Sequence, residues 1–151
     1  MAGQEINALV AQFLATVKNA HIKPRWQTAR HPDYAEAKML VSAPDSRTFV
    51  GVVVLTAHRV RLPPKYSFSL LFRGQRVLGL DVSPGRAHRN LLVPGSVTGT
   101  HWQVWPTMDA QLDDRDQPFA PWLREFLKVG NIVTTFGVVS APPRGVQLRL
   151  V

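Results

Sequence analysis

The chain contains no cysteine among its 151 residues. Disulfide bonds and zinc sites built from thiolates are therefore excluded. No apolar run approaches the roughly 18 residues that a membrane-spanning helix needs. The N-terminal stretch MAGQEINALVAQF also lacks the basic region and the uninterrupted apolar region of a secretory signal. These absences predict a cytoplasmic protein of a prokaryote or its phage that does not associate with membranes.

The motifs of several large enzyme classes are missing as well. The sequence has no P-loop, no GxSxG, no HExxH and no glycine-rich dinucleotide fingerprint. It also has no internal repeat. These absences argue against P-loop nucleotidases, GxSxG hydrolases, zinc peptidases and dinucleotide-dependent oxidoreductases. The sequence predicts no cofactor and no metal ion.

Acidic residues are scarce relative to basic ones. The chain has 18 Lys and Arg against 10 Asp and Glu, which gives a net charge of +8, and 13 of the 18 are Arg. Guanidinium groups bind phosphate bidentately and stack on bases, so an excess of arginine indicates binding to RNA or DNA. The alternative explanation is a GC-rich genome that encodes Arg in place of Lys.

Length and composition predict one globular domain over residues 1–151, because 45% of the residues are hydrophobic and 19% are charged. Apolar residues at helical spacing predict an amphipathic helix over residues 5–20. A second helix is predicted within PFAPWLREFLKVGNI, with Gly130 as its C-terminal stop. Asp113, Asp114 and Asp116 precede this helix and are interpreted as capping residues.

A series of strands is predicted from Lys38 onward, because runs of Val, Thr, Phe and Leu alternate with Pro and Gly turns. In YSFSLLF alternation places Tyr66, Phe68, Leu70 and Phe72 on one face and Ser67 and Ser69 on the other, so one face of the sheet is covered. Gly74-Gln75 suits a tight hairpin. Further strands are expected at HRVRL, IVTTFGVV and VQLRLV. We therefore predict an α+β fold with a mainly antiparallel, curved sheet of about six strands and two covering helices.

The stretch LDVSPGRAHRN, followed by THWQVW, is the best candidate for an active site. It places an acid, imidazoles, arginines and an asparagine around Pro-Gly turns, where the hydrophobic core does not require them, and such loops often carry function. Alternation along THWQVW predicts that His101, Gln103 and Trp105 share one face. The candidate catalytic residues are Asp81, Arg86, His88, Asn90 and His101.

The chemistry that a pair of histidines permits is cleavage of RNA. One neutral imidazole removes the proton of a 2′-hydroxyl, and a second, protonated imidazole protonates the leaving oxygen. An arginine would stabilise the charge of the transition state, and Asp81 would fix the tautomer of one imidazole. The phosphate-binding surface is predicted to comprise Arg59, Arg61, Arg73, Arg76 and Arg89, with Trp105 available to stack on a base.

Two other interpretations of this segment remain open. In the first, His88 and Asn90 stabilise turns, while His101 is a half-buried strand residue with a backbone partner. In the second, Asp81, His88 and His101 form a metal site of two histidines and one aspartate.

The order of a strand, Asp81, PGRAHRN, a polar spacer and THW resembles the small toxins of TumE type and related uncharacterised prokaryotic families. The resemblance covers residues 66–105, about a quarter of the chain. It implies a curved antiparallel sheet, an RNA-directed toxin and a small antitoxin partner. The segment LGLDVSPGRAH has two more residues between Asp and His than the family pattern, and Trp102 with Gln103 replaces the second histidine of the later segment.

Two functional hypotheses follow. The first is a toxin-like ribonuclease that cleaves RNA with a pair of histidines. The second is a non-enzymatic phage or mobile-element protein, such as an anti-CRISPR, that inhibits a bacterial defence nucleoprotein by occupying its nucleic-acid groove. The ribonuclease would leave cut RNA, whereas the inhibitor would form a stable stoichiometric complex.

Overall fold

The computed structural model describes residues 2–84 and 99–145. Four residues of the predicted site and surface, Arg86, His88, Arg89 and Asn90, therefore lie outside the described residues. So does the strand that was predicted over VQLRLV.

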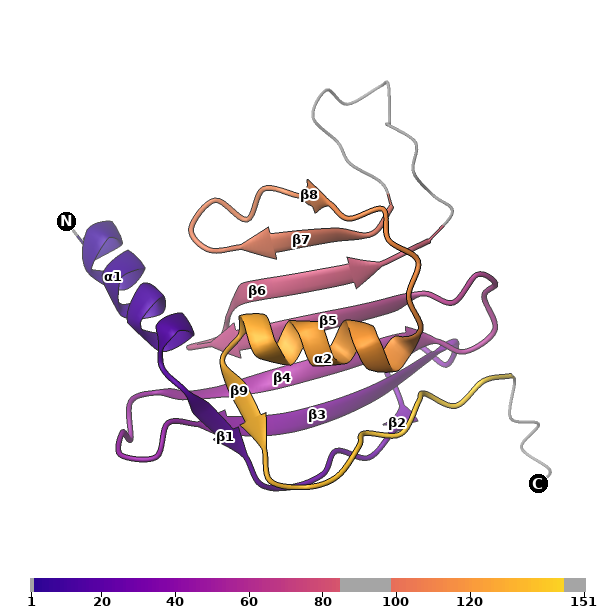
Figure 1. The fold of residues 1–151 in the computed structure, drawn as a ribbon, viewed down its shortest axis with the longest axis horizontal. Coiled ribbons are helices and arrows are strands. Elements are labelled where there is room, and N and C mark those ends of the chain that lie inside the picture. Colours follow the sequence, from indigo (N-terminus) through magenta and orange to yellow (C-terminus); the bar gives the residue numbers. More distant parts are fainter. Residues whose placement is uncertain (1, 85–98, 146–151) are drawn as a thin grey trace.

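The described residues form two helices and one sheet of nine strands (Figure 1). The helices are α1 (Ala2–Ala15) and α2 (Phe119–Val129). The strands are β1 (Lys18–Ala20), β2 (Gln27–Thr28), β3 (Tyr34–Ser42), β4 (Val50–His58), β5 (Tyr66–Phe72), β6 (Gln75–Val82), β7 (His101–Val104), β8 (Gln111–Leu112) and β9 (Ile132–Thr134).

The sheet is open and mostly antiparallel, with the order β8-β7-β6-β5-β4-β3-β1-β9, while β2 pairs with β3. Only β1 and β9 pair in parallel. This confirms the predicted α+β class, whereas the predicted number of about six strands is too low. The excess comes from β1, β2 and β8, which have two or three residues each and are too short to produce a periodic pattern in the sequence.

Two details of the predicted strands are corrected by the register. Phe72 pairs with Gln75, so the β5–β6 turn consists of Arg73 and Gly74, one residue earlier than predicted. Both turn residues have positive φ, 52° and 75°, as a tight turn that matches the twist of the strands requires. HRVRL contributes only His58 to a strand, and the predicted strand over IVTTFGVV is limited to β9.

Both helices cover the same face of the sheet (Figure 1). The Phe13 ring of α1 stacks on Phe72 with centroids 4.1 Å apart. Phe68, two pleats along the same face, contacts the rings of Phe119 and Phe126 from α2 at 5.6 and 5.7 Å. A Cβ atom at Gly51 would lie 2.8 Å from the Phe13 ring, so glycine allows α1 to approach the sheet.

The first helix ends at Ala15, five residues before its predicted end. The backbone N–H of Lys18 instead donates to the carbonyl of Asn131, which starts the pairing of β1 with β9. The buried Lys18 Nζ donates to the carbonyls of Phe13 and Thr16, and the Asn131 side chain donates to that of Leu14. These donors satisfy carbonyl groups that the helix leaves free at its C-terminus. Burial lowers the pKa of Lys18 to about 8.

The second helix begins after Pro118 at the N-cap, where no side chain makes a capping hydrogen bond. The prediction that Asp113, Asp114 and Asp116 cap this helix is therefore wrong. The Asp113 carboxylate accepts hydrogen bonds from Arg115 and from Trp102 Nε1, the latter at 3.1 Å. These bonds lower the pKa of Asp113 to about 2, and the bond from Arg115 is the largest cause. Gly130 is the C-cap as predicted, and Asn131 after it takes the positive φ of 54°.

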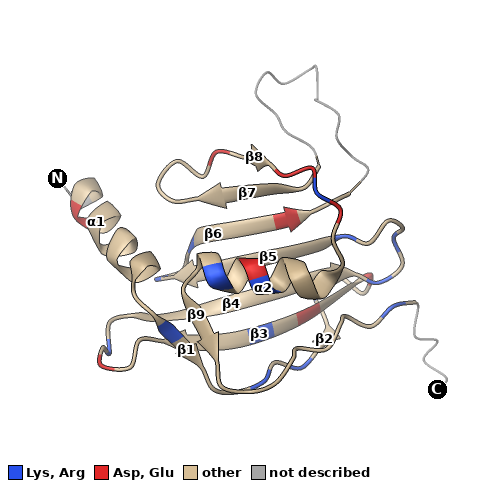
Figure 2. Cartoon of the chain, in the orientation of Figure 1, with Lys and Arg blue, Asp and Glu red and all other residues tan. Residues whose placement is uncertain are grey.

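Charged residues are distributed unevenly over the described chain. Figure 2 shows basic segments in the loop between β4 and β5 and in the C-terminal stretch at the same end of the sheet. Within residues 2–84 and 99–145, no helix is long and apolar enough to cross a membrane.

The buried position of Trp122 on α2 generates a stability prediction. Trp122 is only 1% exposed and belongs to the core cluster, so Trp122→Ala would leave a large cavity. We expect the free energy of unfolding in urea to fall by about 3 to 5 kcal/mol. Leu62→Ala is the control, because Leu62 is 78% exposed and should change that free energy by less than about 0.5 kcal/mol. Equal losses in the two variants would contradict the packing of α2.

Candidate functional site

One end of the sheet brings together residues that are far apart in the sequence. The register pairs Tyr34 with His58 across β3 and β4, and Asp81 with His101 across β6 and β7. Between these pairs, Tyr66 lies opposite both Ala57 and Val82. The starts of β3, β5 and β7 and the ends of β4 and β6 therefore meet at one end of the sheet (Figure 1).

Asp81 is the centre of a polar network on the face of the sheet opposite the helices. Its Oδ2 lies 3.1 Å from His101 Nε2, and its Oδ1 accepts a hydrogen bond of 2.6 Å from Ser67 Oγ. Arg76 Nη2 also donates to Oδ1 at 3.0 Å. Burial alone would raise the pKa of Asp81, but the hydrogen bonds from His101 and Ser67 and the charge and hydrogen bond of Arg76 outweigh it. The pKa consequently lies well below its usual range.

Arg76 connects three strands through its guanidinium group. Nε donates to Ser69 Oγ at 2.8 Å on β5, and Nη1 donates to Gln103 Oε1 at 2.5 Å on β7. The group lies over Gly79, where a Cβ atom would overlap the guanidinium. Glycine is thus required at position 79 for Arg76 to cross the sheet in this way. Together, Ser67, Ser69, Arg76, Asp81, His101 and Gln103 form what we call the Asp81 network.

Both ring nitrogens of His101 face acceptors. Nε2 faces the Asp81 carboxylate, and Nδ1 lies 2.7 Å from the carbonyl oxygen of Gly99. Each nitrogen must carry a proton to donate to its acceptor, so the imidazolium form is favoured. The hydrogen bond to Asp81 raises the pKa of His101, burial opposes this, and the bond to Gly99 adds to the increase.

This geometry limits the chemistry of His101. An imidazolium has no lone pair and cannot accept a proton from a 2′-hydroxyl, so the base role is closed to His101 in this arrangement. The environment is also the one expected for a half-buried strand residue with a backbone partner. No group of three or more His, Asp or Glu side chains within the described ranges could hold a metal ion.

The structure brings together only part of the predicted site. Asp81 and His101 are in direct contact, and Arg76, predicted to bind phosphate, donates to both Asp81 and Gln103. Ser67, Ser69 and Gln103 were not predicted as site residues. Two signals were available: the alternation in YSFSLLF placed both serines on the face away from the core, and the alternation in THWQVW placed Gln103 on the face of His101.

A second cluster lies at the same end of the sheet. Arg144 donates to the carbonyls of His58 and Arg61 at 3.2 and 2.7 Å, which ties the C-terminal stretch to the β4–β5 loop. Lys65 Nζ lies 6.0 Å from the centre of the Tyr34 ring. We call Arg59, Arg61, Lys65 and Arg144 the basic cluster. Within the part of the chain that the structure describes, none of these four cations forms a salt bridge.

Aromatic rings lie among these cations. The Tyr34 ring packs edge to face against His58 and His31, with centroids 4.9 and 5.6 Å apart. Tyr34 and His58 are partly exposed, and His31 is exposed. Cations interleaved with accessible rings can bind phosphates and stack on bases.

The remaining predicted surface residues lie elsewhere. Arg73 is in the β5–β6 turn, and the seven residues of β5 span roughly 20 Å, so Arg73 and Arg61 cannot contact the same phosphate. Trp105 lies beyond the end of β7, packs against the core and donates its Nε1–H to Asn7 of α1 at 2.7 Å. The prediction that Trp105 shares the face of His101 is therefore wrong, because the alternation ends at Val104.

Comparison with protein-family models, with curated protein sequences and with solved structures finds no match for this chain.

The contact between His101 and Asp81 predicts a specific titration. We expect the His101 Cε1–H signal in NMR spectra to titrate above pH 6.5, the ordinary value for histidine. Asp81→Asn removes the largest cause of the increase and should lower the His101 pKa. Asp33→Asn is the matched control, since Asp33 lies near His31 and belongs to a different pair. An identical His101 titration in the wild type and in Asp81→Asn would contradict the contact.

The same contact predicts how stability depends on pH. The raised pKa of His101 means that its contribution is full below pH 6.5 and is lost as the pH rises through the folded value. The lowered pKa of Asp81 means that its contribution is full above pH 3.8 and is lost as the pH falls toward the folded value. In urea denaturation, the free energy of unfolding of the wild type should exceed that of Asp81→Asn most between pH 3.8 and pH 6.5. A stability difference that grows above pH 6.5 would contradict the contact.

Proposed function

We propose that this protein binds the phosphate backbone of RNA or DNA through the basic cluster at the β4–β5 end of the sheet. One observation supports this most: Arg59, Arg61, Lys65 and Arg144 gather there without carboxylate partners among the described residues. Cations that are not neutralised internally remain available to displace counterions from a polyanion. The net charge of +8 favours the same partner.

The aromatic rings suggest that bases are unpaired in the preferred ligand. Tyr34 lies between His31, His58 and the Lys65 ammonium, and its ring is partly exposed. Stacking on such rings requires a base that is not stacked in a duplex. Single-stranded RNA or a looped RNA is therefore the ligand that we favour, and a prokaryotic cytoplasm is the compartment in which we expect the two to meet.

The Asp81 network supports a second candidate, an RNA-cleaving toxin. Asp81 beside His101 is an arrangement that raises the pKa of the imidazole and so favours its protonated form. In this proposal His101 supplies a proton to the leaving oxygen after its Nε2–H turns from Asp81 to the substrate, and His88 removes the 2′-hydroxyl proton. The resemblance to TumE-type toxins motivates this candidate, together with an antitoxin partner.

The non-enzymatic alternative assigns the histidine to the structure alone. His101 would then hold β6 and β7 together, and the basic cluster would occupy the nucleic-acid groove of a bacterial defence nucleoprotein. The complete hydrogen bonding of the His101 ring favours this alternative. Measurements of RNA cleavage and of nucleic-acid binding by variants distinguish the toxin from the inhibitor.

Removing charge from the basic cluster should weaken nucleic-acid binding. Arg61→Gln with Lys65→Gln should lower the affinity for a fluorescent single-stranded RNA of about 12 nucleotides by about tenfold at roughly 100 mM salt, and should reduce the salt slope by about 2. The matched control is Arg47→Gln with Arg73→Gln, which removes the same charge at the opposite end of β4 and β5. An equal loss of affinity in both variants would refute a localised site, and so would affinity indifferent to salt.

The catalytic candidate requires separate variants. If His88 and His101 act as base and acid, His88→Ala or His101→Ala should each slow RNA cleavage by about 10² to 10⁴ and relieve growth inhibition, with RNA affinity retained. The double variant should be little slower than the slower single variant, because the two groups act together. Retention of cleavage in both single variants, or no cleavage by the wild type, would leave only the binding function.

A further inference from the structure

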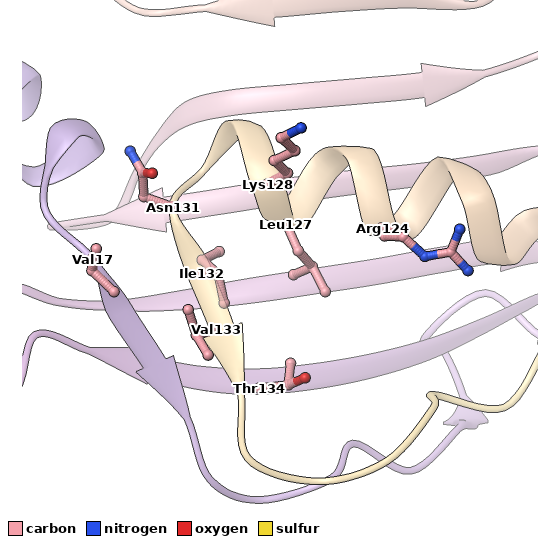
Figure 3. A pocket seen from close by; sticks show the side chains of 8 residues that line it. All are labelled: Val17, Arg124, Leu127, Lys128, Asn131, Ile132, Val133 and Thr134. Carbon is pink, nitrogen blue, oxygen red and sulfur yellow. The ribbon is translucent and has the colours of Figure 1, made fainter.

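A groove lies between α2 and the segment that follows it. One hollow of about 370 Å³ is lined by α2, Asn131, β9 and Val17, and Figure 3 shows Leu127, Ile132 and Val133 around it. A second hollow of about 150 Å³ shares Arg124, Leu127 and Thr134 with the first and continues to Val138 and Val139. The two hollows therefore form one groove along α2.

The floor of the groove includes a free strand edge. Strand β9 is the last strand in the described sheet and pairs only with β1. The bonds from Lys18 N–H to the Asn131 carbonyl and from Thr135 N–H to the Ala20 carbonyl direct the odd-numbered residues toward β1. In a parallel pair, the backbone groups of Ile132 and Thr134 then point away from β1. An extended chain could pair with these groups as an added strand.

The side chains of the groove specify the chemistry of such a chain. Val133 and Val138 are 52% and 77% exposed beside the apolar lining of the groove. Arg124 and Lys128, one turn apart on α2, are the charged residues of the lining, which contains no carboxylate. Apolar side chains of a ligand would fill the hollows, and acidic residues would lie beside the two cations.

We propose that the groove between α2 and β9 binds an extended peptide of a partner protein, in which apolar residues are flanked by Asp or Glu. The peptide extends the sheet at β9, places its apolar side chains against Leu127 and Val138, and pairs its carboxylates with Arg124 and Lys128. This surface lies apart from the basic cluster, so a partner can bind here while nucleic acid is bound at the other site.

Electrostatics disfavours a second copy of this chain as the occupant. Antiparallel pairing of two β9 edges would bring Arg124 and Lys128 of both copies to one interface. Each copy carries a net charge of +8, and like charges across an interface oppose association. An acidic partner relieves this repulsion.

Selection from a random peptide library displayed on phage, with the full-length protein immobilised, tests the proposal. The enriched peptides should share alternating apolar residues flanked by Asp or Glu. A synthetic copy of the most enriched peptide is then the probe, and fluorescence anisotropy measures its affinity.

Two variants test whether the synthetic peptide binds in the groove. Thr134→Pro removes one outward N–H of β9, and Arg124→Ala with Lys128→Ala removes both cations of the rim. Each should lower the affinity at least about tenfold at about 50 mM salt. The control, Lys23→Ala with Arg25→Ala, removes the same charge from exposed positions outside the groove and should leave the affinity within about twofold. Thermal denaturation shows whether Thr134→Pro is folded. If it is not, the variant at Arg124 and Lys128 still tests the proposal, because both residues are exposed on α2 and their replacement should not disturb the fold.

Three outcomes would overturn the proposal. The first is a selection that yields no peptides of the expected pattern, and the second is a selected peptide that binds all variants equally. The third is a wild-type dimer in sedimentation that Thr134→Pro converts to a monomer, which would assign the groove to a second copy.

Discussion

A row of four residues on β5, Tyr66, Phe68, Leu70 and Phe72, supports the rest of the structure. All four are buried on one face, where Phe68 contacts α2 and Phe72 stacks on α1. Burial of apolar area is the largest favourable contribution to folding, so both helices cover this face. The other face keeps Ser67 and Ser69, which hold Asp81 and Arg76. One-sided burial thus separates the core from the polar network.

The sequence predicted the parts of the fold that have a clear periodicity. The pattern in YSFSLLF predicted the covered face, and the spacing around Trp122 predicted α2. It did not predict β1, β2 or β8, because pairings of two or three residues depend on tertiary contacts. The end of α1 was also missed, since the buried Lys18 that binds its last carbonyls resembles an ordinary surface lysine in the sequence. Asp81 and His101 were predicted together because each ends or begins a strand, whereas the contacts of Arg76 depend on the register.

The two candidate sites use charge in opposite ways. In the Asp81 network, Arg76 and His101 are both bound to one carboxylate, so their charges organise three strands. In the basic cluster, no carboxylate balances the cations among the described residues, and their charge is directed toward a partner. A partly buried, hydrogen-bonded ion pair mainly fixes geometry, whereas cations without a carboxylate partner determine attraction over the Debye length. For this reason the basic cluster, more than the histidine, determines the proposed function.

The most direct measurement is a titration of the ¹⁵N-labelled protein with single-stranded RNA, followed by ¹H–¹⁵N correlation spectra at low salt. We expect the largest shift changes on residues 30–34, 58–66 and 144, at the end of the sheet that carries the basic cluster. We also expect these changes to disappear as salt is added. Shift changes centred on α2 and β9, or no changes at low salt, would contradict nucleic-acid binding at the basic cluster.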